Sequence, residues 1–136
     1  MVKWDMAFDA LHLSQLINRD PSAVAAFAGD PEKLPLWAHG LSAGIRCEDG
    51  RWIADSPMGL VEVRFVGCLE FGVLDHEVIL PDGTRVHNPL RVLRNDDASE
   101  VVFTLYRLPG VADDDFERDA ELVREDLARL RDVLES

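Results

Sequence analysis

Residues 71–92, FGVLDHEVILPDGTRVHNPLRV, contain two segments of alternating character that are joined by Pro81-Asp82-Gly83. Alternation is typical of strands, and Pro-Asp-Gly suits a type I turn that is followed by a glycine in the left-handed region. This geometry is the three-residue hairpin with a G1 bulge, which places Leu80 opposite Thr84. The stretch therefore predicts a β-hairpin whose register is set by its turn.

The predicted register divides the side chains of the hairpin between two faces. One face is apolar except for a single polar pair and consists of Leu74, His76, Val78, Val86, Asn88 and Leu90. The other face is mostly charged and carries Asp75, Glu77, Arg85, His87 and Arg91. A two-residue Asp-Gly loop would shift the register by one residue and move Asp75 and Glu77 to the face of Val86. The cleaner segregation favours the three-residue turn, with His76 and Asn88 inside and the charged residues as exposed cross-strand pairs.

Length and composition are those of an ordinary soluble globular protein, with 136 residues, 47% hydrophobic and 29% charged. We interpret residues 1–136 as one domain, with residues 1–8 as a loose leader or an extension of the first strand. No apolar stretch approaches the length of a membrane span, and the first residues lack the basic and apolar regions of a secretory signal. These features predict a cytoplasmic protein without integral membrane association, in which Cys47 and Cys68 are buried free thiols.

The charge is strongly negative and unevenly distributed. A net charge of -12 disfavours nucleic acid as a partner, because phosphate binding needs clustered lysine and arginine. Residues 111–136 contain ten acidic residues and four arginines, which is half of the net charge. This segment is interpreted as a solvated helix face or, alternatively, as an acidic docking surface for a basic partner. The chain itself is expected to be a monomer or a homodimer.

The remaining elements follow from local signals. Alternation over residues 9–19 predicts a strand, and Asp20-Pro21 and Asp30-Pro31 each predict the start of a short helix. Residues 41–108 are predicted to be entirely β, and Asp113-Asp114-Asp115 are predicted to cap a long helix that follows them. Its apolar stripe comprises Phe116, Ala120, Val123, Leu127, Leu130 and Leu134. The order strand, two short helices, six strands and long helix is that of an α+β domain with a bent antiparallel sheet around the helix.

Catalytic and cofactor motifs are missing from the sequence. It contains no GxxxxGK[ST], GxGxxG, GxSxG or HExxH, and its four histidines have no metal-ligand spacing. Hydrolase and ATPase activities are therefore disfavoured, and neither a cofactor nor a metal is expected.

Four segments resemble a known superfamily. Residues 30–37, DPEKLPLW, are similar to its DPENLPxW stretch, and FGVLDH (71–76), VHNPLRV (86–92) and SEVVFTL (99–105) resemble a subgroup of small bacterial members. The chain is identified on these residues as a member of the SRPBCC superfamily, which includes START, Bet v 1-like and polyketide cyclase/dehydrase-like proteins. The resemblance covers residues 9–135 and implies a helix-grip fold, with a bent seven-stranded sheet. Because one fold serves carriers, receptors and cyclases, it assigns no catalytic residue.

The resemblance implies an elongated, mostly apolar cavity between the sheet and the long helix. In this sequence the expected ligand-binding wall is Trp37, Trp52, Val63, Phe65, Leu74, His76, Val78, Val86, Asn88, Leu90, Phe103, Leu105, Phe116, Val123 and Leu127. For the strand at 100–108 this wall uses the face of Phe103 and Leu105, and the alternative is the face of Thr104 and Tyr106. An apolar pocket with a few convergent polar groups is the general form of a small-molecule site.

The candidate side chains allow more than one role. His76 and Asn88 satisfy each other or the backbone, orient a ligand, or, for His76, move a proton as a general acid or base. Trp37 and Trp52 either pack in the core or stack on a flat ligand. The leading hypothesis is a module that binds a lipid, polyketide, isoprenoid or aromatic compound. A cyclase or dehydratase that uses His76, and a protein-interaction module that uses the acidic helix, are the alternatives.

Overall fold

The computed structural model describes residues 7–136, so most of the leader expected at residues 1–8 lies outside the described residues. The strands are β1 (Ala10–Ile17), β2 (Gly44–Glu48), β3 (Arg51–Ser56), β4 (Gly59–Phe65), β5 (His76–Ile79), β6 (Arg85–Asn88), β7 (Leu90–Asn95) and β8 (Ala98–Tyr106). The helical elements are α1 (Pro21–Ala28), η1 (Pro31–Lys33), α2 (Leu34–Trp37), η2 (Leu69–Phe71) and α3 (Asp113–Glu135), where η marks a 3-10 turn.

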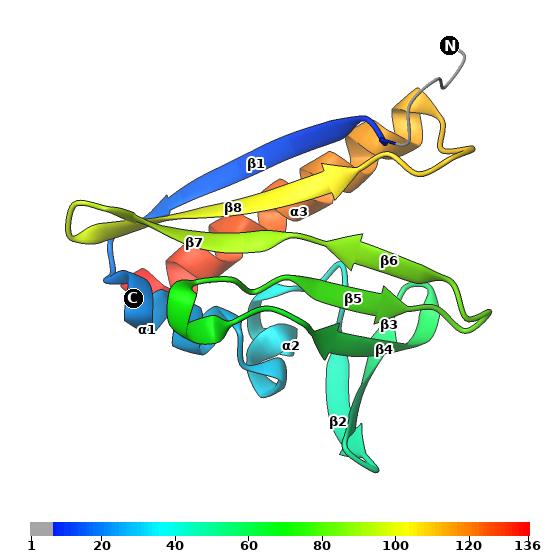
Figure 1. Cartoon of the computed structure of the whole chain (residues 1–136), viewed down its shortest axis with the longest axis horizontal. Helices are drawn as coiled ribbons and strands as arrows, with labels where there is room; N and C mark the ends of the chain where they lie inside the picture. The colour runs from blue at the N-terminus through cyan, green and yellow to red at the C-terminus, as the bar shows by residue number, and fades with distance from the viewer. Residues whose placement is uncertain (1–6) are drawn as a thin grey trace.

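The strands form a three-stranded antiparallel sheet, in the order β1-β8-β7, and a five-stranded one, in the order β2-β3-β4-β5-β6 (Figure 1). The expected α+β class, a bent antiparallel sheet around a long C-terminal helix, is confirmed. The strand predicted up to Val92 is divided at Pro89, because proline cannot donate to a ladder and interrupts the pairing. The chain therefore pairs with β5 up to Asn88, as β6, and with β8 from Leu90 onward, as β7.

The three-residue turn of the central hairpin is confirmed. The amide of Gly83 donates to the carbonyl oxygen of Leu80 over 2.9 Å, and the amide of Leu80 donates to Thr84 over 2.8 Å. Gly83 has a φ of 89°, the left-handed conformation that the bulge requires. The pairs His76 with Asn88 and Val78 with Val86 follow from this register, as predicted.

Asp75 departs from the expectation of an exposed cross-strand residue. Its carboxylate accepts two hydrogen bonds from Arg91, over 2.8 Å and 2.7 Å, and a third from the amide of Leu90 over 3.0 Å. Asp75 is buried as a result, although it faces away from His76 as predicted. The reason is the break at Pro89, because Asp75 fills the gap where the second strand of the hairpin changes sheets.

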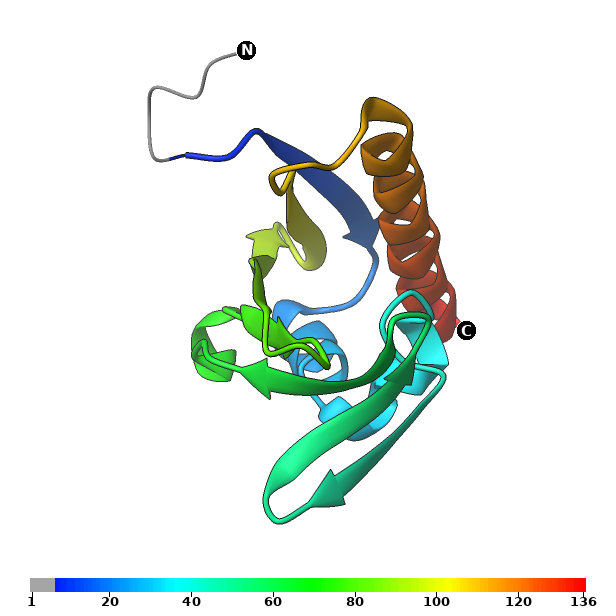
Figure 2. The ribbon, with the colours of Figure 1, turned by 90° about the vertical axis from the view of Figure 1, so that its right-hand side faces the viewer.

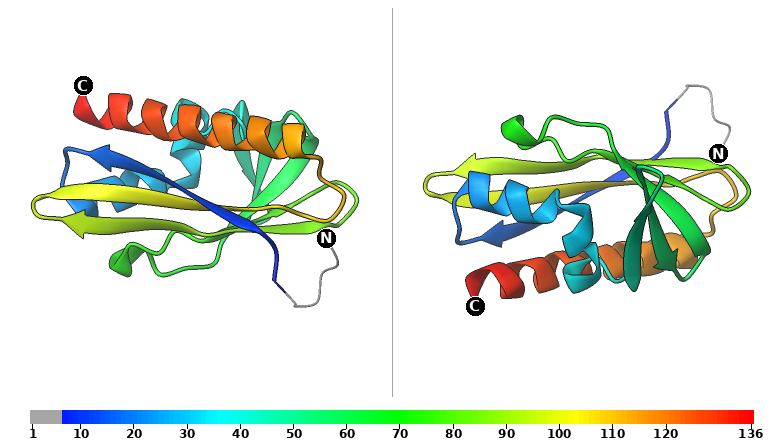
Figure 3. Two further views of the ribbon diagram at one scale, coloured as in Figure 1. Left: turned by 90° about the horizontal axis from the view of Figure 1, so that it is seen from above. Right: turned by 90° about the horizontal axis from the view of Figure 1, so that it is seen from below.

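The long helix α3 lies along the three-stranded sheet and packs mainly on β1 (Figures 2 and 3). Of its predicted stripe, Ala120, Leu127, Leu130 and Leu134 are buried, while the remaining two are half-buried. The helix cap is Ala112, so the three aspartates of residues 113–115 occupy the first turn and no side chain caps the helix. Their charge still favours the helix, because it faces the positive end of the helix dipole.

The short helices start where the sequence predicts. Asp20 accepts from the amide of Ala23 at the start of α1, and Asp30 accepts from the amide of Glu32 at the start of η1. The prediction of buried thiols is wrong, because Cys47 and Cys68 are both free and exposed. Cys47 lies on β2, an edge strand, and Cys68 precedes η2. Among residues 7–136 no helix is long and apolar enough to cross a membrane.

Candidate functional site

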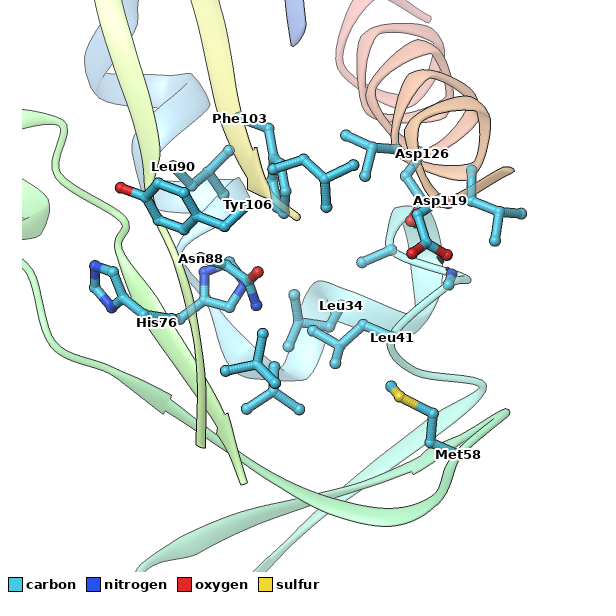
Figure 4. A pocket seen from close by; sticks show the side chains of 18 of the residues that line it. Leu34, Leu41, Met58, His76, Asn88, Leu90, Phe103, Tyr106, Asp119 and Asp126 are labelled. Atoms are coloured by element: carbon cyan, nitrogen blue, oxygen red, sulfur yellow. Dashed lines mark hydrogen bonds between the residues drawn. The ribbon is translucent and has the colours of Figure 1, made fainter. Parts of the chain in front are cut away.

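An apolar pocket of about 320 Å³ lies between α3, the inner faces of both sheets and the α2 region. Its apolar lining comprises Leu34, Trp37, Ala38, Gly40, Leu41, Met58, Phe65, Val78, Leu80, Val86, Leu90, Phe103, Leu105, Leu108, Val111, Leu122, Val123 and Leu127. Six further residues add polar groups, namely His76, His87, Asn88, Tyr106, Asp119 and Asp126. Figure 4 shows the sheet wall, with His76 and Asn88, across the pocket from the two aspartates of α3.

Most of the predicted wall is brought together in this pocket. The predicted residues that line it are Trp37, Phe65, His76, Val78, Val86, Asn88, Leu90, Phe103, Leu105, Val123 and Leu127. On β8 the pocket uses the face of Phe103 and Leu105, whereas Thr104 lies outside and contacts His12. Tyr106, the last residue of β8, also borders the pocket, although it shares the outer face of Thr104.

Four predicted wall residues do not line the pocket. Val63 and Leu74 are each only 1% exposed and pack in the core away from the pocket. Trp52 is half-buried beside Val63 on the neighbouring strand, in the five-stranded sheet. Phe116 lies under the guanidinium of Arg107, 5.8 Å from its ring centre. The strands form sheets of three and five strands in place of the single seven-stranded sheet that was expected, and part of their inner surface belongs to the core.

His76 is the most buried polar group of the wall, with 5% of its surface exposed. Its ring lies between Phe65 and Phe103, with ring centres 5.3 Å and 6.3 Å away. Burial lowers its pKa, and the carbonyl of Leu74 and the charge of Asp75 oppose this shift only in part. The imidazole is therefore neutral at physiological pH.

The tautomer of His76 follows from its one hydrogen bond. Nδ1 lies 3.0 Å from the carbonyl oxygen of Leu74, and a carbonyl can only accept, so Nδ1 carries the proton. Nε2 is then a bare acceptor, and it has no hydrogen-bond partner among residues 7–136. Asn88 lies directly opposite on β6, yet no hydrogen bond joins the two side chains. The backbone thus satisfies one nitrogen of His76 and leaves the other available.

Asn88 adds a further polar group to the sheet wall. Its side chain has no hydrogen-bond partner among the described residues, so it is available to a ligand, whereas the hydroxyl of Tyr106 points away from the pocket (Figure 4). His87 was expected outside and is exposed, but it also contributes to the lining. His87 lies on β6, the last strand of the five-stranded sheet.

Asp119 and Asp126 on α3 were not predicted as site residues. Burial raises the pKa of Asp126, whose carboxylate accepts from the amide of Gly40 over 3.2 Å and from Arg129 over 2.9 Å. Burial, followed by the charge of Asp115, also raises the pKa of Asp119, which has no hydrogen bond or ion pair within residues 7–136. Both flank Val123 at helical spacing, and this spacing was the signal available in the sequence.

One buried donor in the wall is left without a partner. Trp37 is 5% exposed, and its Nε1 forms no hydrogen bond within the described part of the chain. The atom is covered by protein, so it lies behind the pocket surface. Such an unpaired buried donor destabilises the fold by about 1–3 kcal/mol. Because Nε1 is covered, Trp37 offers only apolar surface to the pocket.

Comparisons with known proteins establish the fold. No family model and no curated protein matches the sequence. Among solved structures, Ara h 8.0201 superimposes with a TM-score of 0.67 at 10% identity, over 94% of this chain and 99% of the other. A START superfamily protein from Mycobacterium smegmatis gives 0.65 at 13% identity, over 93% and 97%.

A third structure is DynU16, a protein from the dynemicin biosynthetic locus, with a TM-score of 0.72 at 15% identity. The match covers 94% of this chain and 48% of DynU16. At such identities the likeness is one of fold. The chain has the helix-grip fold of the Bet v 1 and START proteins, as the sequence resemblance implied.

Proposed function

We propose that this helix-grip protein binds a hydrophobic small molecule, such as a lipid, polyketide, isoprenoid or aromatic compound, in the pocket under α3. The observation that carries the proposal is the pocket itself, which is lined mainly by leucine, valine and aromatic side chains. Its volume of about 320 Å³ is at the lower end of the range typical of small-molecule sites. A compact ligand, or one segment of a longer ligand, fits this volume.

Binding would be driven by removal of apolar ligand surface from water, which contributes about 25 cal/mol per Å². The leucines and valines of both sheets and of α3 provide that surface, and the polar groups of the wall would fix the orientation. The helix-grip neighbours agree with a hydrophobic ligand in general.

The binding proposal is tested by looking for a co-purified ligand and by comparing probe binding to the wild type and to a variant whose pocket is filled. Native mass spectrometry of gently purified protein should reveal an added mass, and the uncharged probe N-phenyl-1-naphthylamine should gain fluorescence on binding. Val86→Phe, on the pocket wall, should weaken probe binding at least about tenfold by filling the space. Val102→Phe is the matched control, because Val102 is also half-buried but lies outside the pocket. Equal probe binding by the wild type, Val86→Phe and Val102→Phe would refute the proposal.

Acid–base catalysis by His76, as in a cyclase or dehydratase, is the second candidate. The unprotonated Nε2, free of partners among the described residues and in the pocket wall, is the observation that favours it. A β-hydroxy thioester would then lose water in the presence of the protein, and His76→Gln would abolish turnover but retain probe binding. Equal turnover by the variant would remove His76 from this role.

A further inference from the structure

Some polar groups of the pocket wall already have hydrogen-bond partners within the described part of the chain, and others do not. The carboxylate of Asp126 is held by Gly40 and Arg129. Nε2 of His76 and the carboxylate of Asp119 have no such partner within residues 7–136. The side-chain amide of Asn88 is also without a partner in this part of the chain, so a ligand would complete His76 and Asn88 on the sheet wall and Asp119 on the α3 side (Figure 4).

The free atoms of His76 and Asp119 are hydrogen-bond acceptors, whereas the side-chain amide of Asn88 also offers a donor. A neutral histidine with its proton on Nδ1 can only accept at Nε2, and an ionised carboxylate has no donor. The two sites differ in exposure, because His76 is buried whereas Asp119 is exposed at the outer side of the pocket. Hence a ligand needs a donor at its inner end and meets negative charge at its outer end.

We propose, on the basis of the binding function above, that the pocket selects an uncharged or cationic hydrophobic molecule with a hydroxyl-type donor, and excludes carboxylates. At the inner end, a ligand hydroxyl donates to Nε2 of His76 and accepts from the amide of Asn88, which lies opposite on β6. A ligand carboxylate would offer His76 no donor and would bury a charge without a cation. At the outer end it would lie beside Asp119 and Asp126, and like charges repel.

The arginines near the pocket do not reverse this preference. Arg129 is engaged by Asp126 and by the carbonyl of Trp37, and Arg107 is engaged by Asp113 and by the carbonyl of Val111. Neither guanidinium belongs to the lining. Among residues 7–136, the lining contains no lysine or arginine that could neutralise a bound anion.

The experiment compares three ligands that share one chain and differ in the head group. Decanol, decylamine and decanoate are titrated calorimetrically at about pH 7.5, where the amine is cationic and the carboxylate anionic. We expect decanol and decylamine to bind at least about tenfold more tightly than decanoate. Decanoate binding as tightly as decanol would overturn the inference and leave the proposed function intact. Failure of all three ligands, together with the fluorescent probe, would refute the proposed function itself.

Two charge-matched variants test whether Asp119 causes the preference. Asp119→Asn and Glu117→Gln each remove one negative charge from the same helix, but Glu117 lies outside the lining. We expect only Asp119→Asn to strengthen decanoate and weaken decylamine, each severalfold. If Glu117→Gln produces the same change, the preference comes from the overall negative charge, and the assignment to the pocket is wrong.

Discussion

Asp75 and His76 are neighbours in the sequence and are both buried, yet they face opposite sides of the sheet and serve different purposes. Asp75 accepts three hydrogen bonds, from Leu90 and Arg91, and thereby closes the gap between the two sheets. His76 forms one hydrogen bond, to its own strand, and presents its second nitrogen toward the pocket. The fully satisfied carboxylate of Asp75 stabilises the fold, whereas the free nitrogen of His76, on the pocket wall, is available to a ligand.

The largest effect is expected from removing the satisfied group. Asp75→Ala should lower the free energy of unfolding by about 2–3 kcal/mol, because it leaves the Leu90 amide and part of Arg91 without partners. Arg91 is half exposed, which keeps the loss below that of a fully buried pair. Urea denaturation followed by circular dichroism measures the change.

Glu77→Ala is the control for this variant. Glu77 pairs with Arg85 on the same outer face over 3.5 Å, at a more exposed position. Its loss should cost less than about 0.5 kcal/mol, as for other surface pairs. If the two variants are equally destabilising, the distinction between the Asp75 pair and an ordinary surface pair is wrong.

An intermediate effect on stability is expected from a change of pH, because His76 and Asp75 titrate in different pH ranges. The pKa of His76 is lowered in the folded state, so the unfolded chain binds a proton first and stability falls as the pH drops below about 6.5. The slope for one proton is at most about 1.4 kcal/mol per pH unit. The variant His76→Gln should lack this part of the decline.

The hydrogen bonds from Arg91 lower the pKa of Asp75, so its contribution is present above about pH 4 and is lost only in stronger acid. The pKa values of Asp119 and Asp126 are raised, so these two residues favour the folded state as the pH falls. This contribution is the same in the wild type and in His76→Gln. The difference between wild type and His76→Gln therefore isolates the histidine. A constant difference from pH 7.5 to pH 5 would contradict the buried, neutral state of His76.

The smallest effect is expected at Trp37, whose Nε1 has no partner at all among the described residues. Trp37→Phe removes an unsatisfied donor, and this gain offsets the loss of packing, so stability should change by less than about 1 kcal/mol. Leu34→Ala, at a buried residue of the same helix, should cost about 2–5 kcal/mol and shows that the region is sensitive to packing. A comparable loss in Trp37→Phe would indicate that Nε1 is satisfied after all.

Features that depend on nearby residues were predictable from the sequence. The turn at Pro81-Asp82-Gly83, the helix start at Asp20 and the stripe of α3 each arise from residues a few positions apart, and the structure agrees with them. The register set by this hairpin turn pairs His76 with Asn88, so the sheet wall of the pocket was predictable too.

Features that depend on distant residues were not predictable. The burial of Asp75 needs Arg91, which reaches it only because the chain changes sheets at Pro89. Asp119 and Asp126 become pocket residues because α3 lies over the Gly40 region, which no local pattern specifies. Trp52 and Phe116 were expected in the cavity wall, but Trp52 lies beside Val63 on the neighbouring strand and Phe116 lies under the guanidinium of Arg107.

The contact between Asp126 and Gly40 has a consequence for the order in which the molecule is made. Synthesis proceeds from the N-terminus, so the sheet wall around His76 and Asn88 leaves the ribosome before the α3 wall exists. Until Asp126 arrives to bind the Gly40 amide, the apolar strands have no cover on that side. A growing chain of this protein therefore passes through a stage in which the apolar strands of its pocket are not yet covered by α3.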